Sequence, residues 1–307
     1  MARIVVTGAT GTIGIAVVDT LRARGDDVVA LSRDVERGRA VLGQGVDVQA
    51  WPQPTQTPPP AAALAGADAV VHLLGEPVAQ RWSDAAKQAI RDSRVLATRM
   101  LVSGLGGLGD AERPVTLVSQ SATGIYGPRD GEPLDEQAPA GSDFLANVVV
   151  AWEHEADQAT PLMRVVRTRT GVVLSREGGA LAKMLPFFRL GLGGPIGGGG
   201  QYVAWVHLDD VVGALLFCLD QGDARGPVNL TAPVPVTNAE LSRALGHALG
   251  RPAILPVPAF ALRLLYGEMS QMVTTGQRVI PERLRELGYR FAHPEITEAL
   301  EDVLAQP

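Results

Sequence analysis

The sequence predicts an α/β fold built on a doubly wound parallel sheet, with a smaller C-terminal helical lobe. Short apolar runs rich in β-branched residues alternate with helix-like segments, which is typical of a parallel sheet covered on both faces. A glycine-rich turn joins the first of these runs to the first helix. The 307 residues are enough for one large domain, which buries roughly three-quarters of the surface of its unfolded chain.

Five apolar runs are predicted as strands of this sheet. They do not alternate with polar residues, because both faces of such a strand are buried. The helix after the first run places Ile13, Val17, Val18 and Leu21 on one face and ends at Gly25. The predicted strands are Ile4–Val6, Val28–Leu31, Ala69–Leu74, Val115–Ser119 and Val165–Arg169.

The remaining segments are irregular or helical. Gln53–Pro60 is rich in proline and is predicted as a surface loop. Gly191–Gly200 holds seven glycines in ten residues and is predicted as a mobile loop. Thr237 and Glu240 have the spacing of a capping box. Because prolines break the pattern into short helices after Gly250, we divide the chain into a main unit, residues 1–250, and a small helical domain, residues 251–307.

Composition and charge exclude several classes of protein. The chain is 46% hydrophobic and 20% charged, unlike a disordered or a fibrous protein. Its 27 Lys and Arg against 33 Asp and Glu give a net charge of −6, whereas nucleic-acid binding needs a basic face. No apolar run approaches the ~18 residues of a membrane span, and no signal-peptide core is visible. With a single cysteine, Cys218, we expect a cytoplasmic protein with no disulfide, nucleic-acid partner or membrane anchor.

The turn after the first strand predicts a dinucleotide site. One of its glycines permits the tight turn, a second lets the backbone approach a pyrophosphate, and a third lets helix and strand pack closely. The helix N-terminus offers free N–H groups to the phosphates. A plain strand–helix turn is the alternative, but the surrounding strand–helix–strand order favours a nucleotide. The residues expected to contact it are Thr7, Gly8, Thr10, Gly11, Thr12, Ile13 and Gly14.

The end of the second strand indicates which dinucleotide binds. An NAD site needs a carboxylate there for the ribose hydroxyls, whereas Ser32 and Arg33 suit a 2′-phosphate through charge-assisted hydrogen bonds. Asp34 is the counter-argument, because it lies near the position expected for that carboxylate. Arg33 and Asp34 are alternatively two solvated loop charges. We favour NADP, with NADPH as its reduced form.

Longer motifs resemble a known family. Thr7–Gly14, Ser119–Gly127 and Trp205–Asp210 together are similar to the extended short-chain dehydrogenases/reductases of the NAD-dependent epimerase/dehydratase type. More narrowly, the chain resembles an epimerase-like family with its own C-terminal helical domain, through Ile90–Val95, Gly179–Pro186, Arg189–Pro195, Pro235–Glu240 and Gly276–Pro281. The resemblance implies a Rossmann-like domain that holds the dinucleotide and a smaller lobe over a small-molecule substrate.

The same resemblance implies a set of catalytic residues that this sequence matches only in part. The superfamily uses a tyrosine whose pKa is lowered by a lysine four residues later, with a serine that holds the substrate oxygen. Ser121 matches that serine, but Phe144 and Val148 stand where the tyrosine and lysine are expected. Tyr126 is the nearest tyrosine, and Lys183 could supply a cation to it or polarise a carbonyl, although a solvated helix lysine is the alternative. We predict Ser121, Tyr126 and Lys183 as the catalytic set.

Further charged residues follow the later strands. Leu74, Gly75, Glu76 and Arg81 lie at or after the end of the predicted strand Ala69–Leu74, where Arg81 could reach a phosphate and Glu76 a ribose hydroxyl. Arg169, at the end of the predicted strand Val165–Arg169, is a candidate for binding the cofactor or an anionic substrate. Solvated loop charges are the alternative for these side chains. Arg94 stands where related proteins carry an asparagine, a second departure from the family pattern.

Two kinds of site are not expected. The five histidines have no spacing of three or four residues, so no helix-borne metal site is predicted. His207 is predicted as a structural hydrogen-bonding residue, and Asp209 or Asp210 as a helix N-cap. A Gly-x-Ser-x-Gly elbow is missing from the sequence, which argues against a serine hydrolase.

Two functions remain open from the sequence. The first is an NADP-dependent oxidoreductase or epimerase-like enzyme acting on a small substrate. The second is a dinucleotide-binding sensor or interaction protein without turnover, which the missing tyrosine–lysine pair favours. The intact glycine turn and Ser121 fit both.

Overall fold

A seven-stranded parallel sheet forms the centre of the computed structural model, which describes residues 1–129 and 131–305. The strand order is β3-β2-β1-β4-β5-β7-β11, so the chain winds outward from β1 in both directions, as in doubly wound nucleotide-binding folds. The strands are β1 (Arg3–Thr7), β2 (Asp27–Ser32), β3 (Asp47–Ala50), β4 (Ala69–His72), β5 (Thr116–Ala122), β7 (Arg164–Thr170) and β11 (Gly226–Leu230).

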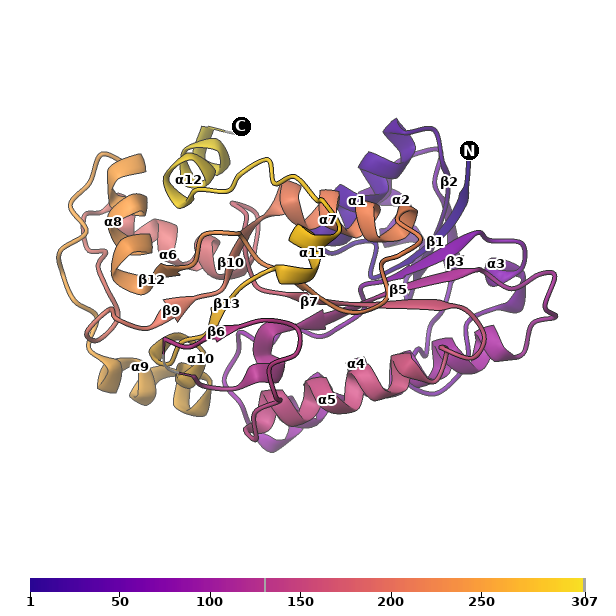
Figure 1. Cartoon of the computed structure of the whole chain (residues 1–307), viewed down its shortest axis with the longest axis horizontal. Coiled ribbons are helices and arrows are strands. Elements are labelled where there is room, and N and C mark those ends of the chain that lie inside the picture. The colour runs from indigo at the N-terminus through magenta and orange to yellow at the C-terminus, as the bar shows by residue number, and fades with distance from the viewer. Residues whose placement is uncertain (130, 306–307) are drawn as a thin grey trace.

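Helices cover both faces of this sheet (Figure 1). In β1, Ile4 and Val6 pack against one layer while Val5 packs against the other, because successive side chains of a strand point to opposite faces. One layer consists of α1 (Thr12–Ala23), α2 (Val35–Leu42) and α7 (Leu208–Asp220). The opposite layer consists of α3 (Ala61–Leu64), α4 (Asp84–Gly106) and α5 (Phe144–Asp157).

A second lobe lies beyond the carboxyl ends of the strands, on the left of Figure 1. Its core unites α6 and α8 with the last helix through Leu181, Leu245 and Leu300. The lobe and its connections contain η1 (Thr123–Tyr126), β6 (Pro133–Leu134), β8 (Val172–Leu174), α6 (Gly179–Arg189), β9 (Tyr202–Val203), β10 (Trp205–His207), β12 (Val236–Thr237), α8 (Asn238–Ala248), α9 (Ala259–Tyr266), η2 (Gly267–Ser270), α10 (Gln271–Thr274), β13 (Arg278–Val279), α11 (Glu282–Glu286) and α12 (Ile296–Ala305).

The chain after Gly250 is held to the main unit at several points. β13 pairs with β6, and Asp210 of α7 accepts hydrogen bonds from the backbone N–H groups of Ala292 and His293. The helical pattern predicted for this segment is therefore present, packed closely against the preceding chain. The proposed boundary at residue 250 stays a prediction, and residues 306 and 307 lie outside the described range.

The predicted fold class is confirmed, with two strands added. All five predicted strands are present, and the sequence prediction missed β3 and β11. The capping box of Thr237 and Glu240 is confirmed at the start of α8. The predicted Asp209 or Asp210 cap of α7 is wrong, because the His207 ring Nδ1 accepts from the N–H of Asp209 instead. In the described part of the chain, every helix is too short or too polar to cross a membrane.

Candidate functional site

The turn between β1 and α1 has the shape of a phosphate cradle. Gly8 has φ +67°, and a Cβ there would lie 2.7 Å from the Leu73 backbone. A Cβ on Gly14 would lie 2.2 Å from the carbonyl oxygen of Gly8. Gly11 is the N-cap of α1 and offers no capping side chain, so the first N–H groups of the helix stay open to a ligand. Gly8 and Gly14 therefore have the tight-turn and close-packing roles that the sequence predicted, and the approach of a pyrophosphate to Gly11 stays a prediction.

The threonines of the turn have different environments. Thr7 is fully buried, and its hydroxyl hydrogen-bonds the His72 ring Nδ1 at 2.7 Å and accepts from the N–H of Leu73. The Thr7 hydroxyl therefore joins β1 to the end of β4, and the contact of Thr7 with the cofactor stays a prediction. Thr12 stands at the open helix end, where a Cβ at Gly178 would lie 2.7 Å from its hydroxyl oxygen. Chain entering α6 thus lies over the start of α1.

Two charged side chains, Arg33 and Glu76, follow the ends of β2 and β4, next to this turn. Arg33 is 68% exposed, and its Nη1 lies 3.3 Å from Glu76 Oε1. Ser32 hydrogen-bonds the backbone of Asp34, and the Asp34 carboxylate caps α2 by accepting from the N–H of Arg37. The carboxylate that argued for NAD is therefore engaged with the helix, while Arg33 stays exposed at the strand end.

The loop after β4 passes over a buried cation. A Cβ on Gly75 would lie 3.1 Å from the guanidinium of Arg94, which lies 5.3 Å from the ring centroid of Trp152 and donates to the carbonyl of Ile90. Burial lowers the pKa of Arg94 to about 10, against the opposing effect of the Glu76 carboxylate. Leu74 and Glu76 belong to this loop, whereas Arg81 is exposed farther along it.

Two of the predicted site residues lie inside the protein instead of facing the cleft. The Ser121 hydroxyl donates to Glu153 Oε1 at 2.6 Å, and Ser121 is 2% exposed. Arg169 forms a two-point ion pair with Glu153, at 2.8 and 2.9 Å, and also donates to the carbonyl of Glu136. Glu153 thus engages both side chains. The roles predicted for Ser121 in holding substrate, and for Arg169 in binding the cofactor or an anionic substrate, stay predictions.

Tyr126 also lies inside the protein. It is fully buried, donates its hydroxyl to Asn229 Oδ1 at 2.7 Å and accepts from Arg169 Nη1 at 3.0 Å. Burial raises the pKa of Tyr126 to about 12, although the Arg169 charge works in the opposite direction. The protein itself thus supplies both hydrogen-bond partners of this hydroxyl, and its part in proton transfer stays a prediction.

Lys183 lies on the exposed side of α6. Its Nζ donates to the carbonyl of Ala79 at 2.6 Å, so it links α6 to the loop that follows β4. The predicted pairing with Tyr126 is not formed, because Tyr126 is buried and hydrogen-bonded elsewhere.

A cavity of about 300 Å³ lies between the sheet and the second lobe. Phe144, at the first position of α5, is on its wall and packs edge-on against Trp82 at 5.2 Å. Val148 is buried one turn later. Thr123 also lines the cavity, two residues beyond Ser121. The sequence prediction missed Thr123. It assigned the hydroxyl that holds the substrate to Ser121 from the position of Ser121 in the family motif, although Thr123 in the same motif also carries a hydroxyl.

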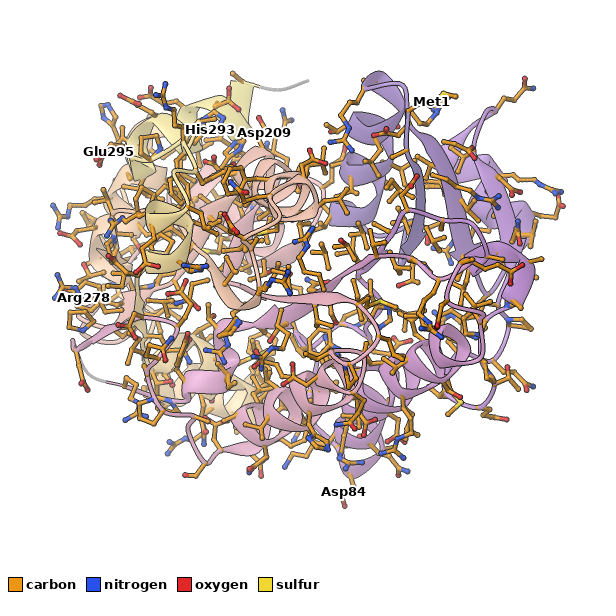
Figure 2. The ribbon with its side chains drawn as sticks, turned by 45° about the vertical axis from the view of Figure 1, so that its right-hand side comes forward. Met1, Asp84, Asp209, Arg278, His293 and Glu295 are labelled. Carbon is orange, nitrogen blue, oxygen red and sulfur yellow. The ribbon has the colours of Figure 1, made fainter. Side chains whose placement is uncertain are left out.

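Four side chains that could bind a metal ion lie together in the fold. The sequence did not predict this cluster, because its histidines are far apart in the chain. The side chains of His207, Asp209, His293 and Asp302 bring one ligand atom each within 4.8 Å of one another. Asp209 Oδ2 is 3.4 Å from His293 Nε2 (both labelled in Figure 2), and the two imidazole rings stack at 3.8 Å. Burial and the neighbouring His293 lower the pKa of His207. The cluster joins α7 to the chain entering α12 and to α12 itself.

Comparison with known proteins agrees with this geometry. The family model described as "NAD dependent epimerase/dehydratase family" matches residues 4–231. The chain belongs to this family. A second model, a domain of unknown function, matches residues 257–303, so the epimerase family domain is followed by a separately recognised C-terminal segment.

Relatives of this epimerase family member are similar along nearly their whole length. An epimerase family protein of Mycobacterium bovis is 41% identical, covering 100% of this chain and 99% of the relative. The chloroplastic SDR39U1 homolog of Arabidopsis thaliana is 38% identical over 97% of this chain and 86% of its own. The crystal structure of human epimerase family protein SDR39U1 with NADPH superposes with a TM-score of 0.87 at 34% identity, covering 98% of both chains.

More distant solved structures share the fold alone. A UDP-glucuronic acid 4-epimerase from Bacillus cereus, solved with UDP-glucuronic acid and NAD, has a TM-score of 0.77 at 16% identity and covers 98% of both chains. These likenesses show the fold of this epimerase family member, whereas the dinucleotide-binding type of its domain rests on the family model. Neither shows the substrate of this chain.

Proposed function

We propose that this protein is an NADPH-dependent oxidoreductase that acts on the carbonyl group of a small substrate. The observation that supports this most is that the fold combines two features. One is a glycine cradle at an open helix end, and the other is a separate cavity beyond the strand ends. The human relative solved with NADPH is consistent with that cofactor. We further propose a cytoplasmic protein, because its one thiol, Cys218, is buried and calls for no oxidising compartment.

The cradle residues would hold the cofactor diphosphate through backbone N–H groups at the start of α1. Arg33 would pair with the 2′-phosphate. Glu76 would then give up its ion pair with Arg33 and accept a hydrogen bond from a hydroxyl of the adenosine ribose. Bound NADPH supplies a hydride from its nicotinamide ring. Thr123 faces the cavity, and no described residue hydrogen-bonds its hydroxyl, so it can donate to a substrate oxygen as negative charge develops there.

Replacing Arg33 by alanine is expected to weaken NADPH binding by about 1.5–3 kcal/mol, the contribution of a hydrogen bond to a charged group. NADH binding should change little, because NADH has no 2′-phosphate. Calorimetric titration of both nucleotides measures the two values. Arg39→Ala removes a similarly exposed cation that pairs with Glu36 inside α2, and it should leave both affinities intact. Equal losses for NADPH and NADH in Arg33→Ala would contradict the assignment of Arg33.

Replacing Thr123 by valine is expected to lower kcat for carbonyl reduction about 100-fold, because one preorganised donor to the developing oxyanion is lost. Thr123→Ser keeps the hydroxyl and should retain most of the activity. Ser121→Ala is the matched control, since that hydroxyl donates to Glu153 and not into the cavity. Steady-state rates of NADPH consumption provide the comparison. A larger loss in Ser121→Ala than in Thr123→Val would return the role to Ser121.

A second candidate function is supported by Phe144 and Val148. These residues occupy the start of α5, where the family resemblance places a tyrosine and a lysine, and they provide neither a hydroxyl nor a charge. The protein would then bind NADPH as a redox sensor or docking module. Tight NADPH binding without turnover over a broad carbonyl panel would favour this second function.

A further inference from the structure

The walls of the cavity are largely hydrocarbon. Helix α6 contributes Leu181 and Met184, and the aromatic rings of Trp82 and Phe144 close the side nearest α5. The other apolar side chains on the wall come from β8, β9, α8, α10, α12 and the intervening segments: Leu145, Val172, Leu174, Ile196, Val203, Leu241, Met272, Val273 and Leu300. Such a surface gains free energy by covering apolar area of a ligand, at about 25 cal/mol per Å².

The polar side chains on this wall are mostly engaged with the protein itself. Gln201 donates both amide N–H groups to the carbonyls of Ile196 and Val273. Asn238 accepts from the N–H of Ile196, and Gln277 donates to the carbonyl of Gly127. These amides hold loops together and have little capacity left for a ligand. Three lining residues have polar side-chain groups that no described residue hydrogen-bonds, namely Thr123, Tyr202 and Gln271. The wall can therefore meet only a few polar groups of a ligand, and the Thr123 hydroxyl is the one nearest the end of β5.

The charges around the cavity are unfavourable for an anion. Among the described lining residues there is no lysine, arginine or histidine. The lining does include two carboxylates, Asp143 and Glu268. Asp143 caps α5, and Glu268 pairs with Lys87. Moving a phosphate out of water without a cationic partner costs several kcal/mol per charge, so this wall disfavours a diphosphate.

A polar hollow adjoins the cavity at Tyr202 and does not supply the missing cation. Arg129 lines it, but its Nε donates to the carbonyl of Tyr126 and its Nη2 to that of Pro139. Glu132 shares the same hollow. The positive charge of Arg129 thus has backbone partners and a nearby carboxylate.

We propose that the cavity takes an uncharged, largely apolar aldehyde or ketone and does not take a sugar nucleotide. The inference rests on the proposed oxidoreductase function. The hydrocarbon body of the substrate lies between α6 and the Trp82–Phe144 pair, with its carbonyl oxygen at Thr123. In the reduction, the hydride and its two electrons from NADPH form a new C–H bond at the carbonyl carbon. The oxygen takes a proton from water, which gives an alcohol and NADP⁺.

Octanal, 1-octanol and UDP-glucose are suitable probes with the NADPH-loaded full chain. We expect NADPH consumption with octanal and at least tenfold weaker or undetectable binding of UDP-glucose. 1-Octanol cannot be reduced, so its binding, followed by calorimetry and thermal shift, tests the cavity without turnover. Met184→Lys places a charge on the cavity wall and should weaken octanol binding at least tenfold. Phe187 lies on the same helix and is 60% exposed. Phe187→Lys therefore adds the same charge at the surface and should leave octanol binding unchanged.

The outcomes separate this inference from the proposed function. Octanol binding that Met184→Lys removes, with no turnover of octanal or of the broader carbonyl panel, would support the apolar cavity and overturn the oxidoreductase assignment. UDP-glucose binding tighter than octanol binding would overturn the apolar-substrate proposal while leaving NADPH chemistry in place. Failure of both octanol and octanal to bind would also overturn it, even with NADPH bound tightly.

Discussion

Replacing Gly14 by alanine is expected to abolish measurable NADPH binding and to lower the free energy of unfolding by about 3 kcal/mol. The new Cβ would lie 2.2 Å from the Gly8 carbonyl oxygen and 2.7 Å from the Ala9 Cα. Both neighbours are backbone atoms, so α1 must move away from the turn, at the upper end of the cost of overpacking a core. Urea denaturation measures the stability loss, and calorimetry measures binding.

A second glycine of the same turn separates binding from folding. A Cβ on Gly11 would meet nothing closer than 3.4 Å, and its φ of −85° suits alanine. Alanine is a poorer N-cap than glycine but restricts the unfolded chain, so the two effects on stability offset within about 1 kcal/mol. The methyl group would still stand where a pyrophosphate must approach. Gly11→Ala should therefore weaken NADPH binding roughly 10- to 100-fold, or about 1.4–2.8 kcal/mol.

Gly109 supplies the control for both variants. A Cβ added at Gly109 would meet no other atom within 4 Å, and the residue lies after α4, outside the turn. Gly109→Ala should change neither stability nor binding by more than about 0.5 kcal/mol. If Gly11→Ala bound NADPH as tightly as the unchanged chain, the cradle would not approach a diphosphate, and the proposed function would lose its foundation.

Patterns that act over a few residues were readable from the sequence. The glycine turn depends on backbone approaches within Gly8–Gly14, and the capping box of α8 depends on two residues three apart. Short β-branched runs marked most of the sheet. Strand β3, with its sequence Asp-Val-Gln-Ala, has one buried residue, Val48. It is an edge strand, and its pairing with β2 is what makes it a strand, so its local pattern was too weak to detect.

Side-chain roles in the site could not be read in the same way. Ser121 and Arg169 stand at strand ends, where a ligand contact was a reasonable expectation. The direction of both side chains is decided by Glu153, which reaches them from α5 across the face of the sheet. The contact of Lys183 with Ala79 likewise joins segments 104 residues apart. The sequence places such residues near the site, whereas packing decides which of them faces the cavity.

Replacing Glu153 by glutamine is expected to lower the free energy of unfolding by about 3–5 kcal/mol, the usual cost of breaking a buried ion pair. The Glu153 carboxylate accepts from Ser121, from Arg167 Nη1 at 2.9 Å, and from Arg169 at two points. The side chains of Arg167 and Arg169 are only 18% and 8% exposed. Without the carboxylate, the two guanidinium groups would stay buried close to each other and would lose the negative charge that both of them contact.

The neighbouring residue Glu155 on the same helix is the control. The Glu155 side chain is only 11% exposed, but its partner Arg99 is 53% exposed, so the charge that the substitution leaves behind stays in contact with water. A pair of this kind contributes about 0–1 kcal/mol. Glu155→Gln should therefore be close to neutral in urea denaturation. Arg169→Gln combined with Glu153→Gln should cost less than the sum of the two single losses, because neither charge is then left without its partner. Additive losses in that double variant would mean that Glu153 stabilises the fold through packing, and that Ser121 and Arg169 are directed by something other than its charge.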